Sequence, residues 1–299
     1  MADKHILHLL TPLKHMSPFD VNMALDAGFD AALAYTGVTL DEVAGLVQDA
    51  MFSRAPKAGI RTGMFFGGKD AILALDMLSA AEKALVPPFG ISFFADPAGS
   101  FTTAAAMMAC VEKLLIEKKN RALRGLKIAV FGATGVVGFS AAVIAALEGA
   151  EVTLVGYDGV QRVSGRAQAI RERFGVSVQA ADGSDDSRKA GILASTEVAL
   201  CAGRAGVRVL TRAQVAAADH LIAAADVNAV PPSGIEGLDL MANGAELPGP
   251  QGVLGIGPLA IGNVKYRTEF GLFRKMITAT RPVRFDFRDA FRLARELHE

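Results

Sequence analysis

The sequence predicts an α/β protein with two domains. The chain has 299 residues, which is longer than a single hydrophobic core usually supports. Apolar residues make up 51% of the chain and charged residues 21%, as in an ordinary globular protein. Strand-like and helix-like segments alternate along the chain, and this alternation is typical of sheets covered by helices.

Charge and cysteine content exclude several classes of protein. Lys plus Arg and Asp plus Glu both number 31, so the balance does not indicate a nucleic-acid or membrane-surface partner. Cys110 and Cys201 are far apart in apolar settings, and we expect buried thiols in a reducing compartment. The apolar run at the start is too short for a signal peptide, and no later run reaches membrane-spanning length. The expected location is therefore the cytoplasm, with the protein in soluble form.

The first third of the chain alternates between predicted strands and helices. Ser17 and Pro18 are typical of a helix start, and Thr39 with Glu42 forms a predicted capping box for the next helix. The predicted strands lie within 5–10, 31–38, 61–70 and 89–100, and the predicted helices within 17–28, 39–54 and 70–85.

A long predicted helix over 101–120 ends in a charged stretch, and we place the domain junction there, near 118–125. Later strands are expected within 176–182, 198–203 and 221–229, and later helices within 187–196, 211–218, 268–278 and 286–299.

This junction gives an N-terminal α/β domain over 1–118 and a second domain over 119–265, with a cleft between them. C-terminal helices over 266–299 are expected to pack back towards the N-terminal domain. The segment 231–262 is rich in Gly and Pro, which predicts ordered loops beside a site.

The clearest motif is a glycine-rich turn after the buried strand 127–131. Gly132, Gly135 and Gly138 stand in the arrangement G-A-T-G-V-V-G, and a helix follows. A sharp strand-to-helix turn, a backbone that approaches a pyrophosphate and close helix–sheet packing each require a missing side chain. The helix N-terminus then offers N–H groups and partial positive charge to phosphates.

A second strand over 151–156 follows this helix, and Asp158 stands twenty residues after Gly138. Dinucleotide sites place an acid there for the ribose hydroxyls, so the motif predicts a Rossmann-type domain with a parallel sheet that binds NAD or NADP. A glycine turn that serves packing alone is the alternative. The predicted cofactor-binding residues are Gly132, Thr134, Gly135, Val136, Gly138, Tyr157, Asp158, Arg162, Gly203, Arg204 and Asn228.

The choice between NAD and NADP depends on residues just after the strand 151–156. Asp158 favours NAD, because a carboxylate accepts a hydrogen bond from the 2′-hydroxyl and repels a 2′-phosphate. Arg162 and Arg166 could reach a phosphate if Asp158 turned away, or could be solvated helix charges. We expect NAD as the cofactor, with NADP also usable.

The sequence offers no obvious acid–base or metal chemistry. Its histidines lack zinc-ligand spacing, so no metal is expected, and no G-x-S-x-G elbow or Ser-His-Asp arrangement is found. A hydride-transfer enzyme of this kind needs a substrate that loses hydride without a proton transfer.

Four stretches, 96–106, 131–138, 226–239 and 252–265, resemble the bacterial methylene-tetrahydromethanopterin dehydrogenases of one-carbon metabolism, and the similarity runs over the whole chain. The resemblance is to the branch that uses NAD or NADP, since the strictly NADP-dependent sister type has Gly-Arg-Lys where this chain has Gly156-Tyr157-Asp158.

The family's chemistry explains the missing base. The reacting carbon of a methylene-pterin lies between two nitrogens, so the methenyl cation is stable when hydride leaves. The resemblance implies hydride transfer from methylene-tetrahydromethanopterin to NAD or NADP in formaldehyde oxidation, catalysed by positioning. It also implies a homo-oligomer, either a dimer or a trimer.

The resemblance directs attention to polar residues that would hold the pterin, and each has a structural alternative. Thr102 and Thr103 could instead cap a helix, Phe93 could be core, and Asp20 could serve a helix dipole. Lys265 is the expected cation near the reacting centre, or else a solvated lysine. The predicted substrate-side residues are Asp20, Phe93, Asp96, Ser100, Thr102, Thr103 and Lys265.

Three other functions stay open at this point. The substrate could be methylene-tetrahydrofolate, or the protein could sense NAD without catalysis. A shikimate-type dehydrogenase would need a Lys–Asp pair in the first domain, and Lys69-Asp70 are adjacent in sequence rather than clearly opposed.

Overall fold

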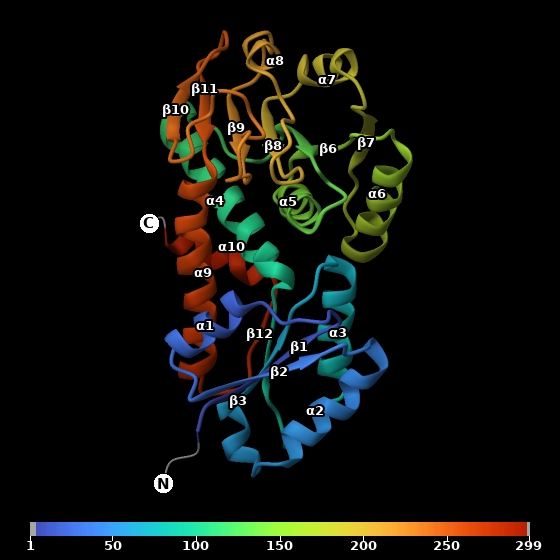
Figure 1. The fold of residues 1–299 in the computed structure, drawn as a ribbon, viewed down its shortest axis with the longest axis vertical. Coiled ribbons are helices and arrows are strands. Elements are labelled where there is room, and N and C mark those ends of the chain that lie inside the picture. Colours follow the sequence, from blue (N-terminus) through green and yellow to red (C-terminus); the bar gives the residue numbers. More distant parts are fainter. Residues whose placement is uncertain (1–3, 298–299) are drawn as a thin grey trace. The chain divides into compact units, whose positions relative to one another are not determined.

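The computed structural model describes residues 4–297, and its contacts divide the chain into two compact units (Figure 1). The first unit takes the chain up to Thr102 and then Tyr266–Leu293, and the second takes Thr103–Lys265 and the chain from Ala294. Three helices, α4 (Ser100–Lys119), α9 (Pro258–Thr278) and α10 (Phe287–Glu296), cross these divisions. The domain boundaries expected from the sequence stay a prediction.

The first unit contains a five-stranded sheet in the order β12-β4-β3-β1-β2, and all its neighbouring strands are parallel. The two-residue edge strand β12 was not predicted. The strands are β1 (Ile6–Thr11), β2 (Ala31–Thr36), β3 (Thr62–Phe66), β4 (Ser92–Ala95) and β12 (Arg284–Phe285).

Helices α1 (Pro18–Asp26), α2 (Val43–Phe52) and α3 (Ala71–Lys83) connect these strands. The predicted capping box is confirmed, since the Thr39 amide donates to Glu42 Oε2 at 2.7 Å. It opens a 3₁₀ turn that leads directly into α2. Aromatic rings fill the core of this unit: the Phe94 and Phe273 rings lie 5.2 Å apart.

The second unit contains a seven-stranded sheet in the order β10-β11-β9-β8-β5-β6-β7. Every neighbouring pair is parallel except β10 with β11. The order of the parallel strands is that of a doubly wound Rossmann sheet. Successive strands are added on one side of β5 up to β7 and then on its other side from β8, so the strand order reverses between β5 and β8. The strands are β5 (Lys127–Phe131), β6 (Glu151–Gly156), β7 (Gln179–Asp182), β8 (Val198–Cys201), β9 (Ala223–Asp226), β10 (Asn243–Leu247) and β11 (Val253–Ile256).

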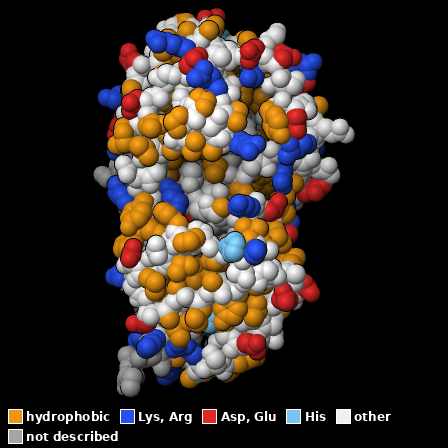
Figure 2. All heavy atoms as spheres, in the orientation of Figure 1, with side chains coloured by type: hydrophobic (Ala, Val, Ile, Leu, Met, Phe, Trp, Pro, Cys, Tyr) orange, Lys and Arg blue, Asp and Glu red, His pale blue; other side chains and the backbone are white. Residues whose placement is uncertain are grey.

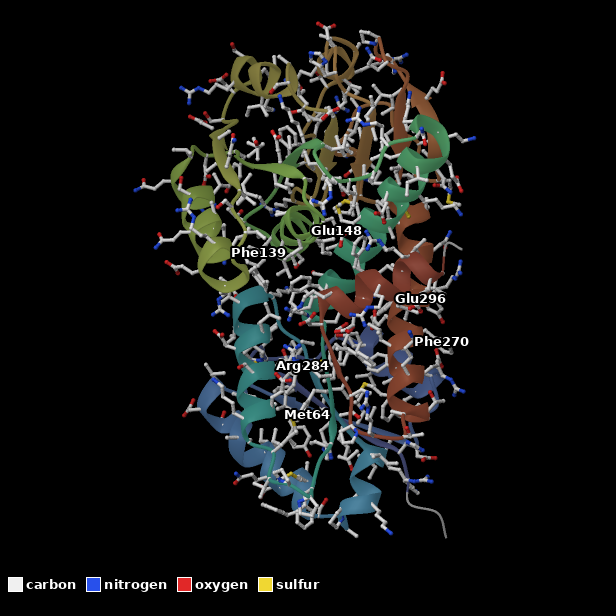
Figure 3. All side chains as sticks on the ribbon, turned by 180° about the vertical axis from the view of Figure 1, so that it is seen from behind. Met64, Phe139, Glu148, Phe270, Arg284 and Glu296 are labelled. Atoms are coloured by element: carbon white, nitrogen blue, oxygen red, sulfur yellow. The ribbon has the colours of Figure 1, made fainter. Side chains whose placement is uncertain are left out.

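Four helices belong to the second unit alone: α5 (Val136–Leu147), α6 (Gln161–Phe174), α7 (Asp186–Leu193) and α8 (Arg212–Ala216). Phe139 near the start of α5 and Glu148 directly after its end are labelled in Figure 3. The guanidinium of Arg295 donates to both carboxylate oxygens of Glu112, at 2.5 and 2.6 Å, and to Glu148 at 2.6 Å. This bidentate pair holds the end of α10 on α4 and α5.

The α/β class with parallel sheets is confirmed, but the segment 231–262 is more regular than expected. It contains β10, β11 and the first residues of α9, rather than loops alone. Gly249 and Gly252 lie between the two strands of the hairpin, and Pro258 is the first residue of α9, where a missing N–H costs nothing. Gly244 lies inside β10 with a φ of +88°, where the pairing with β11 is irregular.

One helix contradicts the expectation that no segment is long and apolar enough to span a membrane. The helical run Pro97–Lys119 passes that test by length and composition, with a mean hydropathy of 1.3. However, 78% of this apolar window is buried inside the protein, as in an ordinary core helix. Within residues 4–297 it is the single helix of this kind.

Candidate functional site

The glycine turn between β5 and α5 is shaped by two close backbone approaches. Gly132 has a φ of +82°, and a Cβ there would clash with the carbonyl oxygen of Ala202 in the loop after β8. A Cβ at Gly138 would lie 2.5 Å from the carbonyl oxygen of Gly132. Packing within the protein therefore requires glycine at both positions.

Gly135 is different, because nothing in the protein requires its missing side chain. It has ordinary extended backbone angles, and the nearest atom to an added Cβ would be 3.4 Å away. Gly135 is also the N-cap of α5 and supplies no side-chain cap to the helix. The N-cap residue therefore offers no side-chain acceptor to the first-turn N–H groups of α5, whose partial positive charge can act on a ligand.

A pocket of about 600 Å³ lies beside this turn, at the carboxyl ends of β5, β6, β7 and β8. In a doubly wound sheet, ligands bind at this edge, where the strand order reverses. The pocket lies wholly within the second unit. Its lining residues are Phe131, Gly132, Thr134, Gly135, Val155, Tyr157, Arg162, Gly183, Lys189, Ala202, Gly203, Arg204, Val207, Arg208 and Val209.

The pocket wall is cationic. Four of its described lining residues are Lys or Arg and none is Asp or Glu. Lys189 pairs with Asp186 at 3.1 Å and Arg208 with Glu236 at 2.7 Å, whereas Arg204 has no ion pair with any residue of 4–297. Figure 2 shows Lys and Arg side chains (blue) gathered on the second unit below the place where Figure 1 labels β7 and β8. Such a wall suits an anionic ligand.

The ion pair of Arg162 and Asp158 stands at one side of this pocket. Arg162 Nη1 donates to Asp158 Oδ2 at 2.9 Å and to the Tyr157 hydroxyl at 3.2 Å. The hydrogen bond to Asp158, followed by that to Tyr157, raises the pKa of Arg162. Tyr157 and Arg162 line the pocket, but Asp158 does not.

Asn228 lies outside the set of pocket-lining residues and organises loops instead. Its Oδ1 accepts hydrogen bonds from the amides of Gly206 (3.2 Å) and Val230 (3.0 Å), and its Nδ2 donates to Pro232 O at 3.0 Å. The amide of Asn228 in turn donates to Asp226 Oδ1 at 2.9 Å. Asn228 therefore ties the segment after β9 to the loop after β8.

Seven of the predicted cofactor residues line this one pocket, although they come from distant segments. Val136, Gly138, Asp158 and Asn228 are not part of its wall. Sequence reasoning missed Lys189 and Arg208, whose placement follows from the strand order that brings the ends of β7 and β8 to the same edge. The seven are Gly132, Thr134, Gly135, Tyr157, Arg162, Gly203 and Arg204.

In the first unit, the predicted residues Asp96 and Thr102 bind each other. Asp96 is fully buried, and its carboxylate accepts hydrogen bonds from the amides of Phe101 (2.8 Å) and Thr102 (3.2 Å) and from Thr102 Oγ1 (2.6 Å). These contacts cap the first turn of α4 and follow the helix-capping alternative.

The other predicted substrate-side residues are scattered over several elements. Phe93 is buried in β4, and its ring lies 6.1 Å from that of Phe66, as expected of a core residue. Asp20 is buried in the first turn of α1, and Ser100 is buried at the start of α4. Thr103 is half-buried in α4, and Lys265 is half-buried in α9.

The two cysteines and the adjacent Lys69 and Asp70 do not line this pocket. No group of three or more His, Cys, Asp or Glu side chains within residues 4–297 is placed to hold a metal ion. Cys110 and Cys201 are both buried, and burial raises the pKa of Cys110 to about 12. Asp70, considered above with Lys69, caps α3 by accepting a hydrogen bond from the Leu73 amide at 2.9 Å.

Comparisons with known proteins show which family this chain resembles. Residues 18–98 match the family model for the N-terminal part of methylene-tetrahydromethanopterin dehydrogenase. The chain is 54% identical to the NAD(P)-dependent methylenetetrahydromethanopterin dehydrogenase of Methylorubrum extorquens, over 98% of this chain and 99% of that protein. It is 32% identical to the bifunctional protein MdtA of the same organism, over 94% of each chain.

Among solved structures, the NAD-dependent malic enzyme of Thermotoga maritima has a TM-score of 0.61 at 12% identity, covering 97% of this chain and 84% of that one. At this identity the likeness concerns the fold alone. The much closer sequence relatives carry the assignment further: the chain belongs to the family of the NAD(P)-dependent methylenetetrahydromethanopterin dehydrogenases.

Proposed function

We propose that this protein catalyses the reversible transfer of a hydride from methylene-tetrahydromethanopterin to NAD⁺ or NADP⁺, giving the methenyl product and the reduced dinucleotide. The pterin substrate is proposed from the 54% identity to the Methylorubrum extorquens enzyme, and the single observation that carries the dinucleotide part of this proposal is Gly135. The protein itself leaves room for a side chain there, yet the position is glycine and heads an uncapped helix in a cationic pocket. A pyrophosphate bound against the first turn of α5 would explain why position 135 is glycine, because a side chain there would meet the phosphates.

The residues present fit a nicotinamide dinucleotide. Gly132, Thr134 and Gly135 would hold the pyrophosphate. Tyr157, directly after β6, and Arg162, in the first turn of α6, line the side where the adenosine ribose binds in such sheets. Gly203 and Arg204 follow β8, which lies on the opposite side of β5 from β6, and they are the proposed contacts of the nicotinamide. When bound, NAD⁺ or NADP⁺ would supply the hydride acceptor.

The work of the chain in this reaction is to position and to exclude water. The reacting methylene carbon lies between two nitrogens that stabilise the cation formed when hydride leaves, so no side chain has to move a proton. A buried, close approach of the two reactants accounts for most of the rate enhancement in such a reaction, and water must be kept from the methenyl carbon.

Polar residues of α1, α4 and α9 are the proposed contacts of the pterin. Asp20 and Ser100 of the first unit stay candidates for pterin binding, with Thr103 and Lys265 as further candidates whose polar groups the mechanism leaves unassigned. Asp96 and Thr102 serve the same region as positioning residues, because their mutual hydrogen bonds fix the turn that starts α4.

The cellular setting is part of the same proposal. The pterin is a small-molecule partner, and the reaction fits formaldehyde oxidation in the cytoplasm. A homo-oligomer, either a dimer or a trimer, is proposed by analogy with the family, and neither a nucleic acid nor a membrane enters the proposed function.

The test is to mix the purified protein with NAD⁺ or NADP⁺ and each methylene-pterin, and to follow the absorbance of the reduced nicotinamide and the methenyl product. Equal appearance of both products with methylene-tetrahydromethanopterin is expected. Turnover with methylene-tetrahydrofolate alone would change the substrate, and dinucleotide binding without turnover of either pterin would indicate an NAD-sensing protein instead.

A further inference from the structure

The wall of the pocket presents a guanidinium where the sequence leads one to expect a carboxylate. Arg162 lines the pocket, whereas Asp158, the expected ribose ligand, is turned to Arg162 and does not line it. Asp158 directly follows Tyr157 in the sequence, and Tyr157 does line the pocket. The ion pair therefore borders the pocket, with Arg162 in the wall and Asp158 hydrogen-bonded to it at 2.9 Å.

Both partners have the freedom to rearrange. The side chain of Arg162 is 56% exposed and that of Asp158 is 35% exposed, and a surface pair of this kind contributes little to stability. Arg162 is the second residue of α6, so its side chain leaves the first turn of the helix. The Tyr157 ring lies 5.8 Å from the guanidinium carbon and gives Arg162 an apolar surface to lie on.

NAD and NADP differ only in the phosphate on the 2′-oxygen of the adenosine ribose. A carboxylate accepts hydrogen bonds from the ribose hydroxyls of NAD but repels this phosphate, and a guanidinium binds the phosphate with two parallel hydrogen bonds. A site that carries both groups as a separable pair can serve either ligand.

We propose that Arg162 binds the 2′-phosphate of NADP and that Asp158 binds the ribose hydroxyls of NAD, the ion pair between them opening in each case to release the group required. This inference rests on the proposed function, and names the residues that let one pocket use both dinucleotides. Arg166, the other arginine considered from the sequence, has its guanidinium 5.8 Å from the Phe139 ring and does not line the pocket.

The experiment measures the Kd of NADP⁺ and NAD⁺ by direct titration of the whole protein, without pterin. Arg162→Met is expected to weaken NADP⁺ binding at least tenfold and to change NAD⁺ binding less than twofold. Asp158→Asn is expected to weaken NAD⁺ binding about fivefold and to leave NADP⁺ binding equal or tighter. Arg162→Lys keeps the positive charge but lacks the two parallel N–H donors of the guanidinium. Its affinity for NADP⁺ should therefore lie between that of the wild type and that of Arg162→Met.

Arg171→Met is the matched control, because Arg171 is exposed on the same helix and lies outside the pocket wall. Equal weakening of both dinucleotides by Arg162→Met, or no weakening of either, would overturn the proposal, as would a larger loss of NADP⁺ binding from Arg166→Met. If Arg162→Met does not fold, as judged by its circular dichroism, the ratio of the NADP⁺ Kd to the NAD⁺ Kd in Arg162→Lys and in Asp158→Asn tests the proposal instead.

Two further measurements separate this inference from the proposed function. Adenosine 2′,5′-bisphosphate and adenosine 5′-monophosphate are the minimal probes, and the wild type should prefer the first, with the preference shrinking as salt is added. Loss of all pterin turnover with these binding ratios intact would count against the proposed reaction alone. Intact turnover with unchanged ratios in both variants would count against the inference alone.

Discussion

Helices α4 and α5 begin in comparable places and differ in how their first turns are satisfied. Each follows a buried parallel strand, β4 or β5, through a short turn that contains a residue with positive φ. At α4 the chain provides its own anion, since the buried carboxylate of Asp96 accepts hydrogen bonds from the Phe101 and Thr102 amides. At α5 the N-cap is Gly135, and a cationic pocket lies beside the turn.

This difference separates two uses of one physical property. A helix N-terminus attracts negative charge, whether from the protein or from a ligand. Where the protein supplies that charge from a buried side chain, as at α4, the helix end is a structural joint. Where it withholds even a short polar cap, as at α5, the same end is left for a ligand.

The largest effect is expected when α5 receives a carboxylate cap like the one that Asp96 gives α4. Gly135→Asp places a carboxylate at the N-cap, where the backbone angles and the open space permit it. Dinucleotide binding should weaken at least about 100-fold, because a like charge facing the pyrophosphate costs several kcal/mol. Stability should rise slightly, by about 0.5 kcal/mol. Titration with NAD⁺ and urea unfolding measure the two effects.

Gly191→Asp is the control for Gly135→Asp. It makes the same charge change at an exposed position of α7 that has open space around its Cα and lies outside the pocket wall. Unchanged dinucleotide affinity in Gly135→Asp would contradict the ligand role of this helix end.

The second change removes the cap that α4 already has. Asp96→Ala leaves two buried amides without their carboxylate partner and should lower the free energy of unfolding by about 2 kcal/mol. The midpoint of urea unfolding measures this loss. Asp70→Ala, which removes a less buried cap from α3, should cost only about 1 kcal/mol.

A different result at Asp96 would sharpen the sequence-based expectation. If stability stayed unchanged while the KM for the pterin rose, Asp96 would be a substrate ligand rather than a cap. The two readouts are independent, so the variant distinguishes the roles.

The smallest expected effect concerns the turn before α4. Ala98 has a φ of +54°, in the left-handed region where a Cβ is strained, and Gly132 has the corresponding conformation before α5. Ala98→Gly should relieve this strain and raise the free energy of unfolding by about 0.5 kcal/mol, after the entropy of the unfolded chain is counted. Thermal unfolding measures the gain. Asn120→Gly is the control, because Asn tolerates its φ of +51° and should gain less; a loss of stability in Ala98→Gly would show that the methyl group packs usefully.

Much of this comparison could be predicted from the sequence where the signal is local. The glycine spacing from Gly132 to Gly138 and the capping box of Thr39 with Glu42 each fix a backbone conformation within a few residues. The class of fold followed from the alternation of such local signals.

What could not be predicted depends on partners far away in the sequence. Strand β12 has only two residues and exists because β4 pairs with it. Lys189 and Arg208 reach the pocket through the strand order of the second sheet, and the turning of Asp158 towards Arg162 is a matter of side-chain geometry. The Gly-rich hairpin of β10 and β11 lacks the alternation that would have indicated strands.

The first unit is assembled from both ends of the chain, and this has a practical consequence. Phe273 and Phe287 pack against Phe94 and Phe101, with ring centroids 5.2 and 5.4 Å apart. A fragment ending near residue 118 would expose Phe94 and Phe101 and lack the edge strand β12, so it should aggregate rather than fold. A shortened protein with a better prospect of independence would excise the middle instead, joining residues 1–102 to 266–293.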